Sequence, residues 1–202
     1  MKYFIFLISF LFLFTAAWAD EAPKTEAERL KEAGELYFAY KPDDAFDEYI
    51  QLSKDTQNRQ AFLNAAFIAM EKNEPKKAVD IAQAAYKIYP KDREVIEMAA
   101  EAFLADGQYA SAEKLLAQLP EDKDRSGFLY INLARAQIGL GDKKLAKYNL
   151  QLAARAGTHP ALANYLLGTL YEQDKEYKKA AEVFEKASTY DHQFIEAKKH
   201  YA

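Results

Sequence analysis

Small apolar residues recur along this chain at every thirty-fourth position. They form two columns, the second offset from the first by twelve positions: Ala66, Ala100, Ala134 and Gly168, then Ala78, Ala112, Ala146 and Ala180. Larger apolar residues around each pair keep helical spacing, and this spacing changes phase once, as between Glu172 and Lys178. The pattern therefore predicts a two-helix hairpin of about 34 residues that is repeated in tandem.

The interval divides most of the chain into five copies. Four regular copies run at about 59–92, 93–126, 127–160 and 161–194, and a weaker copy at about 26–58 precedes them. The weaker copy is one residue shorter, and an end repeat that is covered on only one side is expected to depart from the pattern. In the copy 93–126, Leu119 takes a place that is small elsewhere and Pro120 follows it, so we expect its second helix to be short.

The last copy carries a known signature. Leu167-Gly168 and Tyr171 in its first helix, followed by Ala180 and Phe184 in its second, resemble the L-G-x-x-Y and A-x-x-x-F pattern of the tetratricopeptide repeat. The repeat of that family has the same period, about 34 residues. The resemblance covers about 26–194, nearly all of the chain after residue 25.

The resemblance implies an all-α fold, an α-solenoid of about five hairpins with residues 195–202 as a C-terminal capping helix. Each hairpin would leave an apolar stripe that only its neighbour covers. The chain departs from the family at the place of the signature tryptophan, which holds Asn164 in the last copy and Phe62, Ile96 and Tyr130 in the others. The alternative is a helical bundle in which the spacing arose by chance.

Residues 1–19 have the pattern of a secretory signal. Lys2 is followed by an apolar run, Tyr3–Phe14, and Ala17-Trp18-Ala19 forms an A-x-A cleavage site. We therefore expect cleavage after Ala19, which leaves residues 20–25 as a polar lead-in. The alternative is an uncleaved anchor, because the largely apolar stretch from Tyr3 to Ala19 reaches the lower limit of length for crossing a bilayer.

Composition narrows the compartment and the class of partner. The chain has no cysteine, which excludes disulfides, thiolate metal sites, a cysteine nucleophile and the lipid-bearing cysteine of a lipoprotein. A cysteine-free helical repeat behind a signal peptide is more typical of the bacterial periplasm than of an extracellular eukaryotic domain. The net charge of −4 becomes −5 once Lys2 is removed, and this mild acidity gives no electrostatic footprint for nucleic acid.

No constellation for catalysis or cofactor binding is visible in the sequence. A surface metal site from Asp191, His192 and His200 is one interpretation, and solvated tail residues are the other. There is no H-E-x-x-H motif, no glycine-rich phosphate loop and no nucleophile elbow. We therefore expect a protein that is not an enzyme, with no catalytic residues, no cofactor and no bound metal.

The resemblance also implies where a partner would bind. In tetratricopeptide folds the first helices of successive hairpins line a concave groove, and carrying that over by register selects Asn64, Phe67, Met70, Met98, Glu101, Ile131, Asn132, Arg135, Tyr165 and Thr169. Asparagine and arginine side chains can bind a peptide backbone or a carboxylate. The alternative is that several of these residues only pack between helices, because shifting a helix by one residue turns its face by about 100°.

Some members of the family bind C-terminal carboxylates through a lysine and an asparagine one turn apart. Neither Asn64 nor Asn132 has a lysine four residues before it, so we do not expect binding of chaperone tails.

Together these features predict a non-catalytic interaction module in the bacterial periplasm. It would hold a peptide or helix of another cell-envelope protein in the groove, within an assembly or secretion system. The alternatives are a self-associating homo-oligomer and a membrane-anchored scaffold subunit of an envelope complex, with membrane contact only if the signal segment stays uncleaved.

Overall fold

The computed structural model describes residues 23–119 and 127–190, and within these ranges every regular element is a helix. The ten helices are α2 (Glu26–Phe38), α3 (Pro42–Thr56), α4 (Arg59–Glu71), α5 (Pro75–Ile88), α6 (Arg93–Ala105), α7 (Tyr109–Leu116), α8 (Gly127–Leu140), α9 (Lys143–Ala156), α10 (Pro160–Gln173) and α11 (Tyr177–Tyr190). The all-α class is therefore confirmed. The expected signal segment, the capping helix 195–202 and the metal-site candidates Asp191, His192 and His200 lie outside the described residues.

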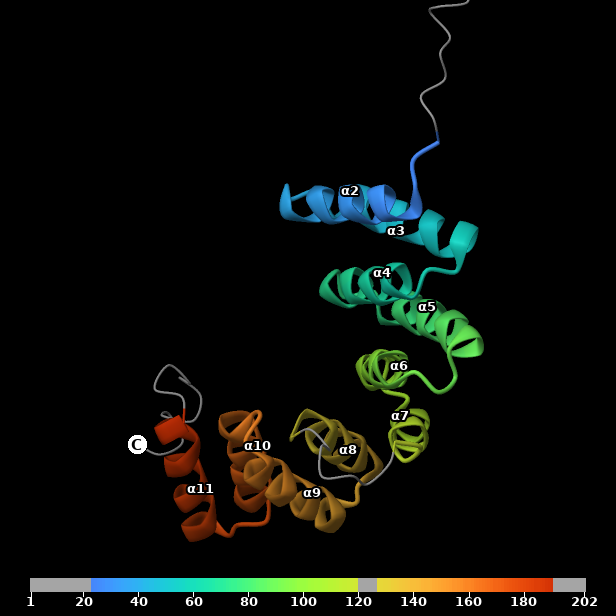
Figure 1. Ribbon diagram of the computed structural model, residues 1–202. Coiled ribbons are helices and arrows are strands. Elements are labelled where there is room, and N and C mark those ends of the chain that lie inside the picture. Colours follow the sequence, from blue (N-terminus) through green and yellow to red (C-terminus); the bar gives the residue numbers. More distant parts are fainter. Residues whose placement is uncertain (1–22, 120–126, 191–202) are drawn as a thin grey trace, which may run out of the picture.

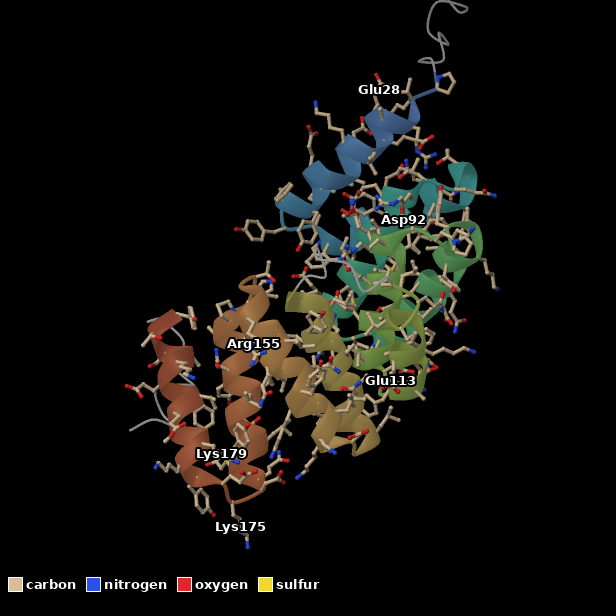
Figure 2. The ribbon with its side chains drawn as sticks, turned by 60° about the horizontal axis from the view of Figure 1, so that its bottom comes forward. Glu28, Asp92, Glu113, Arg155, Lys175 and Lys179 are labelled. Atoms are coloured by element: carbon tan, nitrogen blue, oxygen red, sulfur yellow. The ribbon has the colours of Figure 1, made fainter. Side chains whose placement is uncertain are left out.

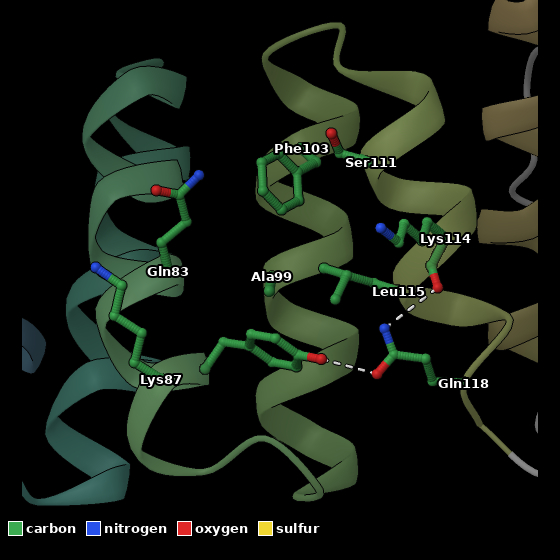
Figure 3. Close-up of a pocket in the computed structure, with 9 residues that line it drawn as sticks. Gln83, Lys87, Ala99, Phe103, Ser111, Lys114, Leu115 and Gln118 are labelled. Atoms are coloured by element: carbon green, nitrogen blue, oxygen red, sulfur yellow. Dashed lines mark hydrogen bonds between the residues drawn. The ribbon is translucent and has the colours of Figure 1, made fainter.

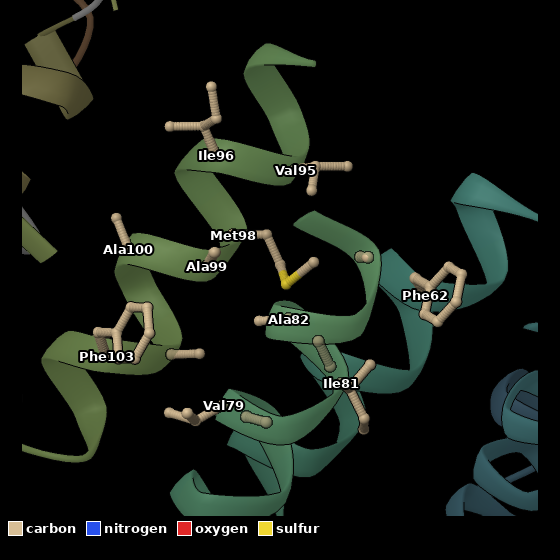
Figure 4. Packing of buried hydrophobic residues seen from close by; sticks show 14 of the residues in the cluster. Phe62, Val79, Ile81, Ala82, Val95, Ile96, Met98, Ala99, Ala100 and Phe103 are labelled. Carbon is tan, nitrogen blue, oxygen red and sulfur yellow. The ribbon is translucent and has the colours of Figure 1, made fainter. Parts of the chain in front are cut away.

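The helices pack as consecutive antiparallel pairs along an arc, so the predicted α-solenoid is confirmed (Figure 1). Helices α4, α6, α8 and α10 face the inner side of the arc, and α5, α7 and α9 face the outer side. All members of the two small columns are buried. Around the third copy, Ala99 and Ala100 lie between larger side chains such as Met98 and Phe103 (Figure 4).

Local signals in the sequence account for several of the helix starts. Side-chain oxygens of Asn58 and Asp92 accept hydrogen bonds from backbone N–H groups three residues on, at 2.8 and 3.0 Å, which caps α4 and α6. Proline is the first residue of α3, α5 and α10, where it has no hydrogen bond to lose. Each turn inside a hairpin contains one residue with positive φ: Tyr40, Asn73, Gly107, Gly141 and Lys175.

Helix α7 has only eight residues, in agreement with the expectation from Leu119 and Pro120. The apolar core divides close to this short helix. One cluster of buried residues runs from α2 to α8, and a second runs from α8 to α11. Helix α8 contributes Leu133 to the first cluster and Ile131 to the second, because its sequence is apolar on nearly every side.

Candidate binding surface

The inner face of the arc is lined by matching positions of successive first helices. One column, which recurs at the repeat interval, consists of Phe67, Glu101, Arg135 and Thr169 on α4, α6, α8 and α10. These four side chains are exposed or half-buried. The chemistry of the inner face therefore changes along the arc from aromatic to acidic, basic and hydroxyl.

An aromatic pocket lies at the N-terminal end of this face. The ring of Tyr37 packs edge-on against those of Phe38 and Phe67, with centroid distances of 5.8 and 6.2 Å. These three residues and Gly34, Tyr49, Asn64 and Ile68 line a cavity of about 200 Å³. Phe38 is 81% exposed and Phe67 is 48% exposed, so the rim of the pocket is open to a partner.

Polar groups are placed inside and beside this pocket. Burial raises the pKa of the Tyr49 hydroxyl, and the nearby Asn64 side chain partly offsets this effect. The Asn64 side-chain oxygen accepts a hydrogen bond of 2.9 Å from Gln60. The Tyr37 hydroxyl donates to Glu71, whose carboxylate raises the pKa of Tyr37. A partner would therefore meet an apolar pocket with an amide inside it and a carboxylate at its edge.

A polar cluster formed by Glu101, Asn132 and Arg135 lies further along the inner face. Arg135 Nη1 donates a hydrogen bond of 3.0 Å to Asn132 Oδ1. Asn132 is fully buried, and its Nδ2 group has no hydrogen-bond acceptor within the described parts of the chain. A buried donor without an acceptor costs about 1–3 kcal/mol, and such groups in native proteins need an explanation.

The carboxyl group of Glu101 is also perturbed. Burial raises its pKa, the neighbouring Glu97 adds to the rise, and Asn132 and Arg135 partly offset it. The Asn132 amide is close enough to favour the charged form of Glu101, although it completes no hydrogen bond to it. The cluster therefore holds a carboxylate that burial destabilises next to an exposed guanidinium.

This shift predicts a pH-dependent effect of replacing Glu101→Gln. Because the folded state raises the pKa of Glu101, its ionisation weakens folding at pH values above the folded pKa. The substitution is expected to raise the melting temperature relative to the parent protein at pH 7–8. The difference should shrink as the pH falls towards the ordinary value of 4.5. Parallel melting curves from pH 4 to 8 measure it, and a constant difference across this range would contradict the assignment.

The remaining residues selected from the sequence have different places. Met98 and Ile131 are buried in the core, which leaves a partner no access to them, and Met70 packs against the core at its edge. The Tyr165 ring packs against Phe184 with a centroid distance of 5.8 Å. Thr169 Oγ1 donates a hydrogen bond of 2.7 Å to the carbonyl oxygen of Leu166.

The structure thus brings together Asn64 with Phe67 in the pocket, and Glu101 with Asn132 and Arg135 in the cluster. The sequence interpretation did not include Tyr37, Phe38 and Tyr49 in the binding face. The first two end a helix just before its turn, at a place where solvated residues are usual, and that aromatic pair was the available signal.

Neither a metal centre nor a membrane span is found in the part of the chain that the structure describes. No group of three or more histidine, aspartate or glutamate side chains in residues 23–119 and 127–190 is arranged to hold a metal ion. In the same ranges no helix has both the length and the apolar character needed to cross a bilayer.

Comparison with known proteins agrees with this architecture. A family model described as tetratricopeptide repeat matches residues 69–137. No curated protein sequence matches the chain. These findings and the solved structures below support the tetratricopeptide repeat family that the sequence resembles.

Several solved structures share the fold at low sequence identity. MamA (residues 41 to the end) from Desulfovibrio magneticus RS-1 has a TM-score of 0.73 and 15% identity, over 86% of this chain and 99% of that one. A thermophilic tetratricopeptide repeat protein from Thermus thermophilus has a TM-score of 0.69 and 16% identity, over 88% and 97%. YrrB, described as having an unusual peptide-binding site, has a TM-score of 0.66 and 17% identity, over 87% and 91%.

Proposed function

We propose that this chain is a non-catalytic interaction module that binds a peptide or helix of a partner protein along the inner face of its arc. The tetratricopeptide fold suggests a protein–protein interaction module, and proteins with this fold are generally not catalysts. The observation that carries the proposal is the open aromatic pocket around Phe67, which offers a place for an apolar anchor residue. The fold that the chain shares with YrrB, a protein described by its peptide-binding site, adds support.

The polar cluster would supply the second contact. Arg135 is exposed, and a guanidinium can donate two parallel hydrogen bonds to a carboxylate. A partner segment that places an apolar side chain in the pocket and a carboxylate near Arg135 would contact both the pocket and the polar cluster of the inner face. The Nδ2 group of Asn132, which has no acceptor within residues 23–119 and 127–190, would gain one if a partner group or a shift of Glu101 reached it.

The place of action that we propose is the bacterial periplasm, within an assembly or secretion system of the cell envelope. The signal pattern of residues 1–19 and the absence of cysteine support it. The mass of the N-terminus of protein recovered from cells tests it. A chain that begins at Asp20 fits the proposal, and a chain that keeps residues 1–19 favours the membrane-anchored scaffold instead.

Site-specific crosslinking tests the binding face. A photoreactive amino acid at position 67 or 135 is expected to capture the same partner segment in intact envelopes. One at position 177, an exposed site on α11, should not. Phe67→Lys should reduce capture from position 135 at least tenfold and leave the helical content unchanged, because Phe67 is half exposed. Equal capture from 67 and 177, or capture that survives Phe67→Lys, would place the binding site elsewhere.

A further inference from the structure

Two pockets, each between the second helices of successive hairpins, are equivalent under the repeat. The first lies between α5 and α7 and has a volume of about 340 Å³ (Figure 3). The second lies between α9 and α11 and has a volume of about 520 Å³. Each residue that lines the first pocket has a counterpart two repeats later that lines the second, as Phe103 and Tyr171 do. Both pockets have an apolar floor and a polar rim.

The junction between α7 and α9 lies between these two and has a polar floor. Gln137 occupies the column of Phe103 and Tyr171, and Asn149 occupies the column of Leu115 and Val183. Asn149 Nδ2 donates to Gln137 Oε1 at 2.8 Å, and Gln137 Nε2 donates to Glu113 Oε1 at 3.2 Å. Both amide side chains are buried, and these hydrogen bonds use both polar atoms of Gln137 and the Nδ2 group of Asn149.

The rim of the same junction is apolar. Leu145 stands where the other two rims have Ser111 and Lys179, and Tyr148 stands where they have Lys114 and Glu182. In a third column, α9 has Leu152 where the other two rims have Gln118 and Lys186. Leu145 is 40% exposed, Tyr148 is 57% exposed and Leu152 is half-buried.

The end of α8 also has an apolar residue where the other repeats have a polar one. Leu140 is exposed, although the equivalent ends of α4, α6 and α10 carry Lys72, Asp106 and Asp174. We call the apolar set Leu140, Leu145, Tyr148 and Leu152 the outer stripe. In the other three regular repeats the positions equivalent to the outer stripe hold polar residues, with Ala84 as the one exception. The fold itself therefore does not require apolar side chains at these positions.

Positive charge accompanies the outer stripe. Lys144 and Arg155 are exposed on α9, four residues before and seven after Tyr148, about 16 Å apart along the helix axis. Figure 2 labels Arg155 on this helix. Within residues 23–119 and 127–190 neither cation has an ion-pair partner. The stripe therefore combines apolar side chains at helical spacing with a cationic edge.

We propose that the outer stripe is a second docking surface, which takes an amphipathic helix of a partner protein whose apolar face is edged by carboxylates. Apolar residues at i, i+3 and i+7 on α9 form a ridge of the kind that packs against another helix. Carboxylates on the partner would pair with Lys144 and Arg155. Two copies of this chain paired antiparallel through α9 would instead bring Lys144 of one against Arg155 of the other, and like charges in contact disfavour that dimer.

Two synthetic helical peptides and the chain from residue 20 to 202 test the proposal. The peptides share leucines at i, i+3, i+4 and i+7, and one is edged by glutamate and the other by lysine. Fluorescence anisotropy is expected to show at least tenfold tighter binding of the glutamate-edged peptide. The paired substitution Lys144→Glu and Arg155→Glu should reverse this preference.

A variant that should lose binding without losing stability is obtained by giving two positions of the outer stripe the residues that the preceding repeat has there. Leu145→Ser with Tyr148→Lys copies Ser111 and Lys114, so it should fold with an unchanged melting temperature and lose at least tenfold in affinity. Tyr177→Lys, which removes an exposed aromatic residue from α11, should leave the affinity unchanged. Phe67→Lys should also leave it unchanged, which separates this surface from the inner-face site.

Several results would overturn the proposal. They are equal binding of the two peptides, binding that survives the Ser/Lys variant, and a melting temperature that falls in this variant, since the stripe would then be covered within the chain. Dimers in light scattering that the variant abolishes would assign the stripe to a second copy. Binding to phosphatidylglycerol vesicles that the variant abolishes would assign it to a lipid surface.

Discussion

Replacing Phe184→Ala is expected to lower the free energy of unfolding by about 3–5 kcal/mol, the usual cost of truncating a buried phenylalanine. Phe184 is 2% exposed and is among the largest fully buried side chains of the described structure. Its ring lies against Gly168 of α10, where an added Cβ would come within 2.4–2.7 Å of three ring atoms. Urea unfolding followed by circular dichroism measures the loss.

The same contact predicts that the effect of Gly168→Ala on the free energy of unfolding changes sign when Phe184 is also replaced. Alanine is better than glycine in a helix by about 1 kcal/mol, but overpacking a core costs about 1–3 kcal/mol. Gly168→Ala alone should therefore destabilise the protein. Combined with Phe184→Leu it should stabilise, because the pair then copies Ala134 and Leu150, which occupy the same two columns in the preceding repeat.

A control comes from the glycine at 139, where an added Cβ would also meet a ring, that of Tyr109 at 2.3 Å. Tyr109 is only half-buried and can turn towards solvent, so Gly139→Ala should cost less than Gly168→Ala. A Gly168→Ala variant that stabilises the parent protein would contradict the packing described for Phe184.

The sequence was sufficient to predict the architecture because the repeated residues are the ones that determine how neighbouring helices pack. A small residue at the same place in each copy lets two helices approach, and the facing column compensates in volume, as Gly168 does for Phe184. The short α7 was predictable from Leu119 and Pro120 for the same local reason. These features depend on neighbours within one or two helices, which periodicity reports directly.

The binding face was harder to predict, because it depends on the rotation of each helix. Ile131 and Arg135 are separated by about one turn of α8, yet one is buried in the second core cluster and the other is exposed. Helix α8 contacts both clusters, so its apolar pattern does not identify its free side. The contribution of Tyr37, Phe38 and Tyr49 to the pocket depends on the stacking of α2, α3 and α4, which sequence spacing does not describe.

The position where the core divides also has consequences for unfolding. Around the α7–α9 junction the helix α7 is short, and Gln137 and Asn149 replace apolar residues in the floor. Less apolar surface is therefore buried there than at the two junctions that have apolar floors. In a repeat protein each unit contacts only its neighbours, so a weak junction lets the parts on either side open separately.

Leu150→Ala is expected to reveal this division. Leu150 is fully buried in the second cluster, and its truncation should cost about 2–5 kcal/mol. Hydrogen exchange should then show lost protection in α9, α10 and α11, with protection in α4 and α5 close to that of the parent protein. Leu116→Ala, in the same column one repeat earlier and also fully buried, is the matched control and should lower protection in α5, α6 and α7 instead. Uniform loss of protection from α2 to α11 in both variants would mean that the two clusters unfold as one cooperative unit. In that case the polar floor of the α7–α9 junction would not weaken the coupling between them.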